Sequence, residues 1–414
     1  MRHRAFKTIV LSGLFFLPLS ASAAENLTDL LIQKGTITKE EAESVQKRSI
    51  SSVVDKIALY GDFRLRQETQ WFSGSGNGSK NRNRQRFRLR IGGDIQEGPI
   101  VVHLRLASGT GEHSSTNQSF GKLSSQKEIW IDRAYLEYTG ISRTTLLGGR
   151  IANPFFMNLT GDLVWDDDYN PEGFAERYAV KWGEGGKIFA TAAQIILDGG
   201  GSGATAQWLL GYQAGTEMKT APATVNLAVL YYSLANGTKD GFSQAAVNEG
   251  NTRVGGSPFD PTLVNPYRIV NATTAVSFKA GLPITISADV LRNLADTVQD
   301  AAAGIEDENM GYAFGLKIGG ASAAHTAELG YLYRAIETDA VVADLIDSDF
   351  GPSGGTNRKG HAVWAAYNPT QGTQFKIKYF NTKILNEDLP PAPIAGSEPN
   401  PAHHRIQADF SVKF

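Results

Sequence analysis

The chain has 414 residues, of which 41% are hydrophobic and 10% aromatic, with 40 basic residues against 42 acidic ones. A charge balance this close to neutral argues against general nucleic-acid binding. The absence of cysteine excludes a disulfide framework, thiolate chemistry and a cysteine-ligated metal.

The first 24 residues have the segment order of a secretory signal peptide. Arg2, Arg4 and Lys7 precede an apolar run at 9–19, and small residues follow at 21–24. The apolar run is too short for a membrane anchor. We therefore expect 1–24 to be removed, which leaves 37 basic residues against 42 acidic ones and a net charge of −5.

Residues 25–56 form a short polar segment with helical signals. Leu27, Leu30 and Leu31 share one helical face, Gly35 ends that pattern, and Thr38-x-x-Glu41 is a capping box. We expect a small periplasmic helical element at about 26–50. A spacer role is the simplest interpretation, because no specific residue supports self-association or cell-wall contact.

From Ile57 onward the hydrophobic period changes to two, which is typical of half-buried strands. Phe87, Leu89 and Ile91, for example, alternate with Arg86 and Arg88. The alternation continues to the C-terminus and predicts sixteen strands, at about 57–68, 84–95, 98–108, 129–139, 143–152, 175–182, 187–197, 205–216, 222–234, 267–280, 283–295, 309–319, 324–337, 359–368, 372–385 and 402–414.

The connections between these strands fall into two length classes. Short turns such as 96–97, 140–142, 183–186, 281–282, 320–323 and 369–371 alternate with long polar loops at 69–83, 109–128, 153–174, 235–266, 296–308, 338–358 and 386–401. Long loops at one end and tight turns at the other are typical of outer-membrane barrels. The predicted fold at 57–414 is therefore an all-β, up-and-down transmembrane barrel of about 16 antiparallel strands, preceded by the short helical segment. Loops 235–266 and 338–358 should face the outside of the cell.

Two features of the chain carry a family resemblance. Alternation in the last strand runs up to Phe414, which resembles the recognition signal of bacterial outer-membrane proteins, and the segments 132–138, 147–150 and 153–155 resemble porins most. The whole organisation resembles the "putative porin" family of Gram-negative bacteria. That resemblance implies a multi-pass barrel in outer-membrane lipid, a water-filled channel for passive diffusion of small polar or charged solutes, and a homotrimer.

Arginines are concentrated in the polar phase of neighbouring strands, where like charges repel unless hydration, anions or carboxylates offset them. They are Arg64, Arg66, Arg84, Arg86, Arg88, Arg90 and Arg105, continued by Arg133 and Arg150. One interpretation is a positive strip along a pore wall. The other is ordinary interior charge, paired with Asp62, Glu68, Asp94 and Glu137 on the same face.

A matching acidic group occupies the loop 153–174. It consists of Asp162, Asp166, Asp167, Asp168 and Glu172. The resemblance to general porins implies that this loop folds into the pore and forms a constriction, with Asp166–Asp168 facing Arg86, Arg88, Arg105 and Arg150. The apolar residues Phe155, Phe156, Leu163, Val164 and Trp165 fit an inward loop. An acidic extracellular loop is the alternative.

Asp166-x-Asp168-x-Asn170 also has part of the oxygen spacing of a calcium loop, but it lacks the later glycine and glutamate of an EF-hand. We therefore expect no metal and no cofactor.

Aromatic residues near predicted strand ends should form interfacial girdles. They are Tyr60, Trp71, Trp130, Tyr138, Trp182, Tyr212, Tyr231, Tyr333, Trp364 and Tyr379.

Two other functions need weighing against a channel. None of the histidines lies in a recognisable nucleophile motif, so we do not expect an enzyme. A structural barrel could act as a sleeve for a partner protein such as an electron carrier. Without a Cys-x-x-Cys-His sequence, its redox centre would have to come from that partner.

Overall fold

The computed structural model describes residues 56–73, 81–199, 205–239, 249–254, 262–300, 304–389 and 401–414, with Ile32, 34–36 and Thr38. The predicted signal peptide at 1–24 lies outside the described residues, as does nearly all of the helical segment predicted at 26–50. Contacts divide the chain into Met1–Ile57 and Ala58–Phe414, and only the second unit is described at length. Within the described residues no helix is long and apolar enough to cross a membrane.

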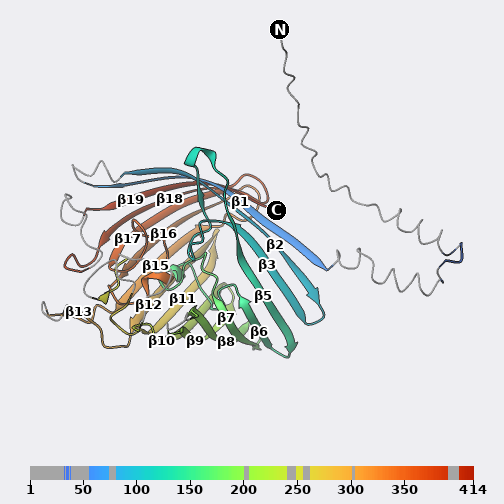
Figure 1. Cartoon of the computed structure of the whole chain (residues 1–414), viewed down its shortest axis with the longest axis horizontal. Coiled ribbons are helices and arrows are strands. Elements are labelled where there is room, and N and C mark those ends of the chain that lie inside the picture. The colour runs from blue at the N-terminus through green and yellow to red at the C-terminus, as the bar shows by residue number, and fades with distance from the viewer. Residues whose placement is uncertain are drawn as a thin grey trace, which may run out of the picture. The chain divides into compact units, whose positions relative to one another are not determined.

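The second unit is a 16-strand antiparallel barrel (Figure 1). Its long strands are β1 (Ile57–Phe72), β2 (Arg82–Glu97), β3 (Ile100–Ser108), β5 (Ile129–Ile141), β6 (Thr144–Arg150), β7 (Glu172–Trp182), β8 (Gly186–Asp198), β9 (Gln207–Thr220), β10 (Ala223–Ala235), β11 (Arg268–Ala280), β12 (Leu282–Asn293), β15 (Met310–Gly319), β16 (Thr326–Ile336), β17 (Arg358–Asn368), β18 (Thr373–Ile384) and β19 (His403–Lys413). Each predicted strand is confirmed, with its ends shifted by a few residues.

Short elements lie in the long connections between these strands. They are β4 (Gln118–Ser119), β13 (Val298–Asp300), β14 (Ile305–Glu306) and the 3-10 turns η2 (Lys122–Ser124), η3 (Gly161–Leu163) and η5 (Ala343–Leu345). β4 pairs with β2 at Arg86 and Phe87, beyond the point where β3 ends, and so it extends the wall on that side.

The barrel closes where the first strand meets the last. β1 pairs antiparallel with β19 from Asp62↔Lys413 to Phe72↔His403, and it also pairs with β2. Every other long strand pairs with its neighbours in chain order. This closure removes the free sheet edges that would otherwise leave backbone groups unsatisfied in lipid.

Burial is inverted relative to a soluble protein. Arg66 and Arg405 face the interior and are only 7% and 1% exposed, whereas Ile131 and Ile377 face outward and are each 59% exposed. An apolar outer surface with a polar interior is the arrangement that a lipid-embedded barrel requires.

Two predicted girdle residues are placed differently. Tyr60 lies in the lumen-facing phase of β1, together with Asp62 and Arg64, so its assignment to a girdle was wrong. Trp364 lies in the lumen-facing phase of β17 and is only 8% exposed, so its assignment to an interfacial girdle was wrong. Strand phase decides the point, because Val363 and Tyr367 face outward while Trp364 alternates with them.

Candidate pore constriction

The loop 151–171, between β6 and β7, lies inside the barrel. Its backbone and side chains contact the wall far from β6: Phe156 N donates to Gln213 Oε1 on β9 (2.6 Å), Asn158 Nδ2 donates to Thr273 Oγ1 on β11 (2.5 Å), and Thr160 Oγ1 donates to Asp289 Oδ2 on β12 (2.5 Å). The inward fold predicted from its apolar residues is therefore what the structure has.

Aromatic packing holds this loop. The Trp165 ring stacks between Phe155 (centroids 5.7 Å apart) and Tyr169 (6.0 Å), and it also contacts Tyr232 on β10 (5.3 Å). Leu163 is fully buried in the same cluster. Burying one large apolar side chain contributes about 2 kcal/mol, so the cluster explains why an otherwise acidic loop leaves bulk water.

A second loop, 337–357 between β16 and β17, also lies inside. Residues 338–346 are all buried, which overturns the expectation that 338–358 is an exposed surface loop. Arg334 on β16 fixes one part of it, because its guanidinium lies 3.9 Å from the Phe350 ring centre and 3.6 Å from Asp347 Oδ2. Arg405 on β19 fixes another, by bonds to Asp349 (2.6 Å) and to the carbonyl of Gly351 (2.9 Å).

The two infolded loops and the loop 109–128 bind one another. Asp166 N donates to Leu345 O (2.8 Å), and Ser348 N donates back to Asp166 Oδ2 (2.9 Å). Ser348 Oγ also donates to Ser114 O (3.3 Å). Three segments that are far apart in the sequence thus form one interior assembly.

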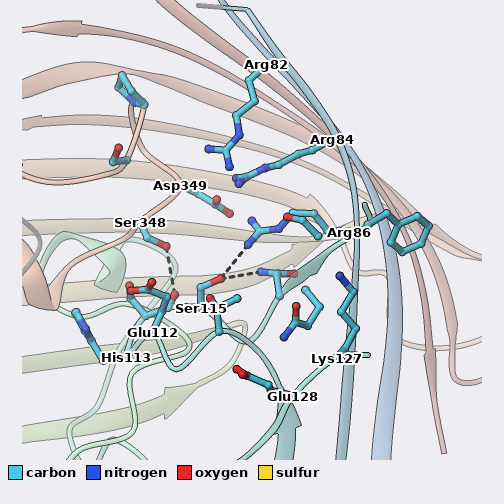
Figure 2. A pocket seen from close by; sticks show the side chains of 18 of the residues that line it. Arg82, Arg84, Arg86, Glu112, His113, Ser115, Lys127, Glu128, Ser348 and Asp349 are labelled. Atoms are coloured by element: carbon cyan, nitrogen blue, oxygen red, sulfur yellow. Dashed lines mark hydrogen bonds between the residues drawn. The ribbon is translucent and has the colours of Figure 1, made fainter. Parts of the chain in front are cut away.

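This assembly leaves two polar cavities along the arginine-bearing wall. The loop-side cavity, of about 550 Å³, is lined by β2 arginines and by residues of the long loops (Figure 2). The turn-side cavity, of about 410 Å³, reaches the short turns at Ala321, Ser322 and Gly372. Both are lined by Ser114, Asn117, Ser348 and Asp349, so these four residues lie where the two cavities adjoin, and we call them the neck.

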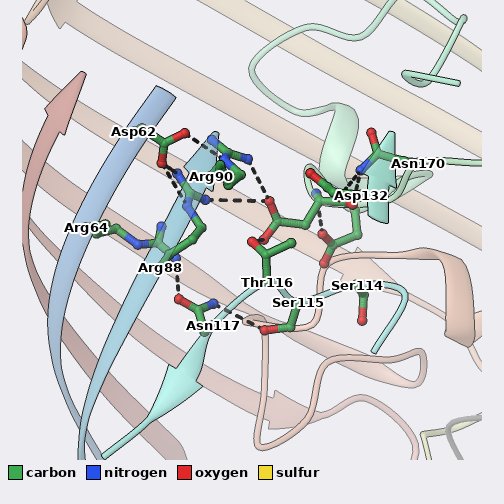
Figure 3. A network of polar contacts seen from close by, with 12 residues as sticks. Asp62, Arg64, Arg88, Arg90, Ser114, Ser115, Thr116, Asn117, Asp132 and Asn170 are labelled. Carbon is green, nitrogen blue, oxygen red and sulfur yellow. Dashed lines mark hydrogen bonds and ion pairs between the residues drawn. The ribbon is translucent and has the colours of Figure 1, made fainter. Parts of the chain in front are cut away.

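The predicted arginines divide into those that face the cavities and those that do not. Arg84 and Arg86 line the loop-side cavity and pair with Glu68, at 2.6 and 3.9 Å. Arg88 and Arg90 line the turn-side cavity and pair with Asp62, at 2.9 and 2.7 Å (Figure 3). The alternative of paired interior charge therefore describes these four side chains.

Arg64 and Arg66 also face the turn-side cavity. Arg66 pairs with Asp409 (2.8 Å) and Asp349 (3.2 Å), while Arg64 lies 3.8 Å from Asp409 and donates to Asn117 Oδ1 in the neck (2.6 Å; Figure 3).

The remaining predicted wall residues line neither cavity. Arg105 pairs with Asp132 (2.5 Å) and Arg133 donates to Asn170 Oδ1 (2.7 Å). Arg150 pairs with Glu172 at the start of β7 (3.0 Å). These contacts hold the base of the infolded loop against β5 and β6. The expectation that Arg105 and Arg150 face Asp166–Asp168 is not met. It is not met for Arg86 either, which lines the loop-side cavity while these aspartates line the turn-side one. Asp94 and Glu137 pair with His103, at 2.8 and 3.5 Å, rather than with an arginine.

The loop aspartates have different environments. Asp168 lies 3.5 Å from Arg88 and 3.4 Å from Arg90; although burial acts to raise its pKa, these arginines lower it below the ordinary value. Burial, Asp347 and Asp168 raise the pKa of Asp166 well above its ordinary value. Asp162 and Asp167 line the turn-side cavity beside them.

The three residues with the partial calcium-loop spacing, Asp166, Asp168 and Asn170, make other contacts. Asp168 binds arginines, Asp166 accepts from the backbone of Asp168 and Ser348, and Asn170 donates to Asp132. Among the described residues no cluster of metal-ligating side chains is found.

Comparisons with known proteins agree with this geometry. A family model described as "Putative porin" matches residues 75–256 and 238–414. The chain belongs to this porin family. It is a porin-like channel of the outer membrane.

Solved porins share the fold at low sequence identity. OprB of Pseudomonas putida, solved at high pH, is 12% identical, with a TM-score of 0.54 over 88% of this chain and 96% of its own. OmpF of Salmonella typhi, in complex with daunomycin, is 11% identical, with a TM-score of 0.50 over 86% and 97%. No curated protein matches the sequence.

Sequence reasoning missed several residues that face the lumen of this porin. Asp349 and Ser348 lie in a loop expected at the surface, and no sequence pattern marks them. Lys376 and Lys378 were discoverable, because they alternate with Phe375, Ile377 and Tyr379 in the predicted strand 372–385.

Proposed function

We propose that the protein conducts small polar or charged solutes by passive diffusion through the two cavities, with the constriction at the neck. One observation carries this proposal: a cavity on the loop side and a cavity on the turn side share Ser114, Asn117, Ser348 and Asp349 in their linings. A solute passing between them meets charged groups on both sides, and pores discriminate through such groups without tight binding.

The wall and the loops supply charges of opposite sign. Arginines project from β1 and β2, while aspartates of the infolded loops face them across the turn-side cavity. The ion selectivity of the channel should therefore depend on these residues.

Planar-bilayer recording of the purified full-length protein tests the proposal. We expect discrete conductance steps in potassium chloride and a reversal potential in a salt gradient that depends on the charge of the neck. A barrel that inserts and conducts nothing would contradict it.

The sleeve function receives no support from the interior. Loops 151–171 and 337–357 occupy the lumen beside the two cavities with the chain's own side chains, including the cluster around Trp165 and Phe350. A partner protein would have to displace them.

Export and assembly complete the proposal. We propose that residues 1–24 are a cleaved signal peptide, that 25–56 form a periplasmic segment, and that the porin assembles as a trimer. Mass spectrometry of the mature protein should find an N-terminus near Ala24 or Glu25, and an intact Met1 would contradict this processing.

A further inference from the structure

The cavity-facing arginines are already compensated by carboxylates. Seven of the eight on β1, β2 and β19 have an acidic partner within 4.0 Å, namely Arg64, Arg66, Arg84, Arg86, Arg88, Arg90 and Arg405 with Asp62, Glu68, Asp349 or Asp409. The eighth, Arg82, lies at the start of β2 and lines the loop-side cavity, not the turn-side one. Paired charges of this kind present little net field to a passing solute. The groups that present a net field to the solute are the charged side chains without a partner.

Two unpaired cations lie together on β18. Lys376 and Lys378 occupy successive lumen-facing positions and line the turn-side cavity, and neither forms an ion pair with any described residue. Successive positions on one strand face lie roughly 7 Å apart, which is close enough for both ammonium groups to reach a single carboxylate.

Aromatic rings support these lysines in place of carboxylates. The Trp364 ring centre lies 5.5 Å from Lys376 Nζ and 5.9 Å from Lys378 Nζ, and the Phe380 ring centre lies 4.5 Å from Lys378 Nζ. A ring face attracts a cation and leaves it free to bind an anion on its other side.

Neighbouring residues of the barrel wall fix the position of the Trp364 side chain. Its indole N–H donates to Glu328 (3.0 Å), and its ring lies over Gly330, where an added Cβ would be 2.0 Å from the ring. Only glycine at 330 leaves room for the indole beneath the lysines.

An unpaired anion faces the same cavity from the infolded loop. Asp167 is exposed and, unlike Asp168, has no hydrogen bond or ion pair with any described residue. The cavity therefore holds free cations on the strand wall and a free anion on the loop.

We propose that Lys376, Lys378 and Asp167 form a transit site for small zwitterionic solutes, which bind the lysines through a carboxylate and Asp167 through an ammonium group. The inference rests on the proposed channel function and adds the solute class. The cavity volume of about 410 Å³ suits such solutes, because small-molecule sites typically span about 300–1,000 Å³.

Liposome swelling with the full-length porin tests the site. Glycylglycine is a zwitterion, and N-acetylglycinamide is an uncharged molecule of similar size and shape. The parent should admit glycylglycine faster, relative to N-acetylglycinamide, than the double variant Lys376→Gln/Lys378→Gln or the variant Asp167→Asn. We expect this ratio to fall about fivefold, the effect of losing one solvated ion pair.

The matched controls are the same Lys→Gln and Asp→Asn substitutions at exposed positions outside the turn-side cavity. Lys383→Gln alters an exposed lysine on the same strand, and Asp388→Asn alters an exposed aspartate of a long loop. Both should keep the parent ratio.

The outcomes separate this inference from the channel function. Failure of both solutes to enter through the parent protein would overturn the channel function itself. Entry of both, with the same ratio in parent and site variants, would overturn the transit site and leave the channel intact. An equal loss of both rates in the variants would also overturn it, because charge would then not discriminate.

Discussion

Oδ1 of Asp349 lies 2.6 Å from Nη1 of Arg405, so an ion pair ties an infolded loop to the last strand of the barrel. The same carboxylate lies 3.2 Å from Arg66 on the first strand. Although burial acts in the opposite direction, these two arginines hold the pKa of Asp349 below its ordinary value. It is therefore ionised throughout the physiological range.

Replacing Asp349 by asparagine should loosen the loop and destabilise the protein. Arg405 is 1% exposed and would lose its carboxylate, and an unpaired buried charge typically costs about 3–5 kcal/mol. The Asp349 side chain is 28% exposed, so we expect a loss of about 2 kcal/mol in guanidinium denaturation. Proteolysis within 337–357 should accelerate. Asp388→Asn, in an exposed loop, is the control, and an unchanged denaturation midpoint for Asp349→Asn would show that the pair is not stabilising.

Asp168 should govern ion selectivity. Its replacement by asparagine leaves Arg88 and Arg90 with one carboxylate fewer, and the channel should shift toward anions in reversal-potential measurements. The shift should shrink as salt rises, because charges in water are screened over about 8 Å at physiological ionic strength. Asp307→Asn, in another loop, should have no effect. A parent-like reversal potential in Asp168→Asn at low salt would rule out this role.

Glu249 gives the loop-side cavity a pH dependence. Burial, and then Asp344, raise the pKa of Glu249 to about 8. The group is therefore mostly neutral at pH 7 and acquires its negative charge as the pH rises through 8. We expect the channel to become more cation-selective between pH 7 and pH 9. Glu249→Gln should remove that change, and a pH response that survives in the variant would assign it to another group.

The same shift has a consequence for stability. The folded state holds the Glu249 proton more tightly than the unfolded state, whose pKa is the ordinary 4.5. Its contribution is thus most favourable at low pH and is lost as the pH rises from about 4.5 to about 8.

Strand number, order and face were predictable because lipid imposes a strict period of two. The outward phase must be apolar and the inward phase polar. The sequence alone therefore predicts that Ile377 faces lipid and that Lys376 faces the lumen. The inward fold of 151–171 was predictable for a similar reason, since exposing the large apolar side chains of Phe155 and Trp165 to water in a solvated loop would be unfavourable.

The pairing of the site was not predictable. Arg105 and Arg133 face inward like Arg88, yet they bind the base of the loop rather than facing a cavity. Arg150 lies opposite Ala134 and Glu172, in the phase of the outward-facing Leu136 and Phe174. Strand phase gives the face of a side chain but not its height in the lumen relative to an interior loop. Loop 337–357 also carries a mostly apolar stretch at 340–346, interrupted only by Asp344, and this signal is similar to the one that identified 151–171.

Surface labelling can test this revised topology, since the chain contains no cysteine. A membrane-impermeant maleimide applied to intact cells should label Asp388→Cys at the long-loop end. It should not label Ser142→Cys at a short turn until the outer membrane is permeabilised. Val341→Cys, at a fully buried position, should stay unlabelled in both conditions while the protein is folded. Labelling of Ser142→Cys alone on intact cells would reverse the orientation.

The barrel closes between β1 and β19, and Asp349 binds one arginine from each of these strands, Arg66 and Arg405. The loop thus links the first and last strands across the line where the barrel closes. A chain whose first and last strands had met before this loop was seated would enclose Arg405 without its carboxylate, at a large energetic penalty. Closure of the barrel and seating of the loop inside it are therefore one cooperative event. A closed barrel without this loop in its lumen is not a stable product of assembly.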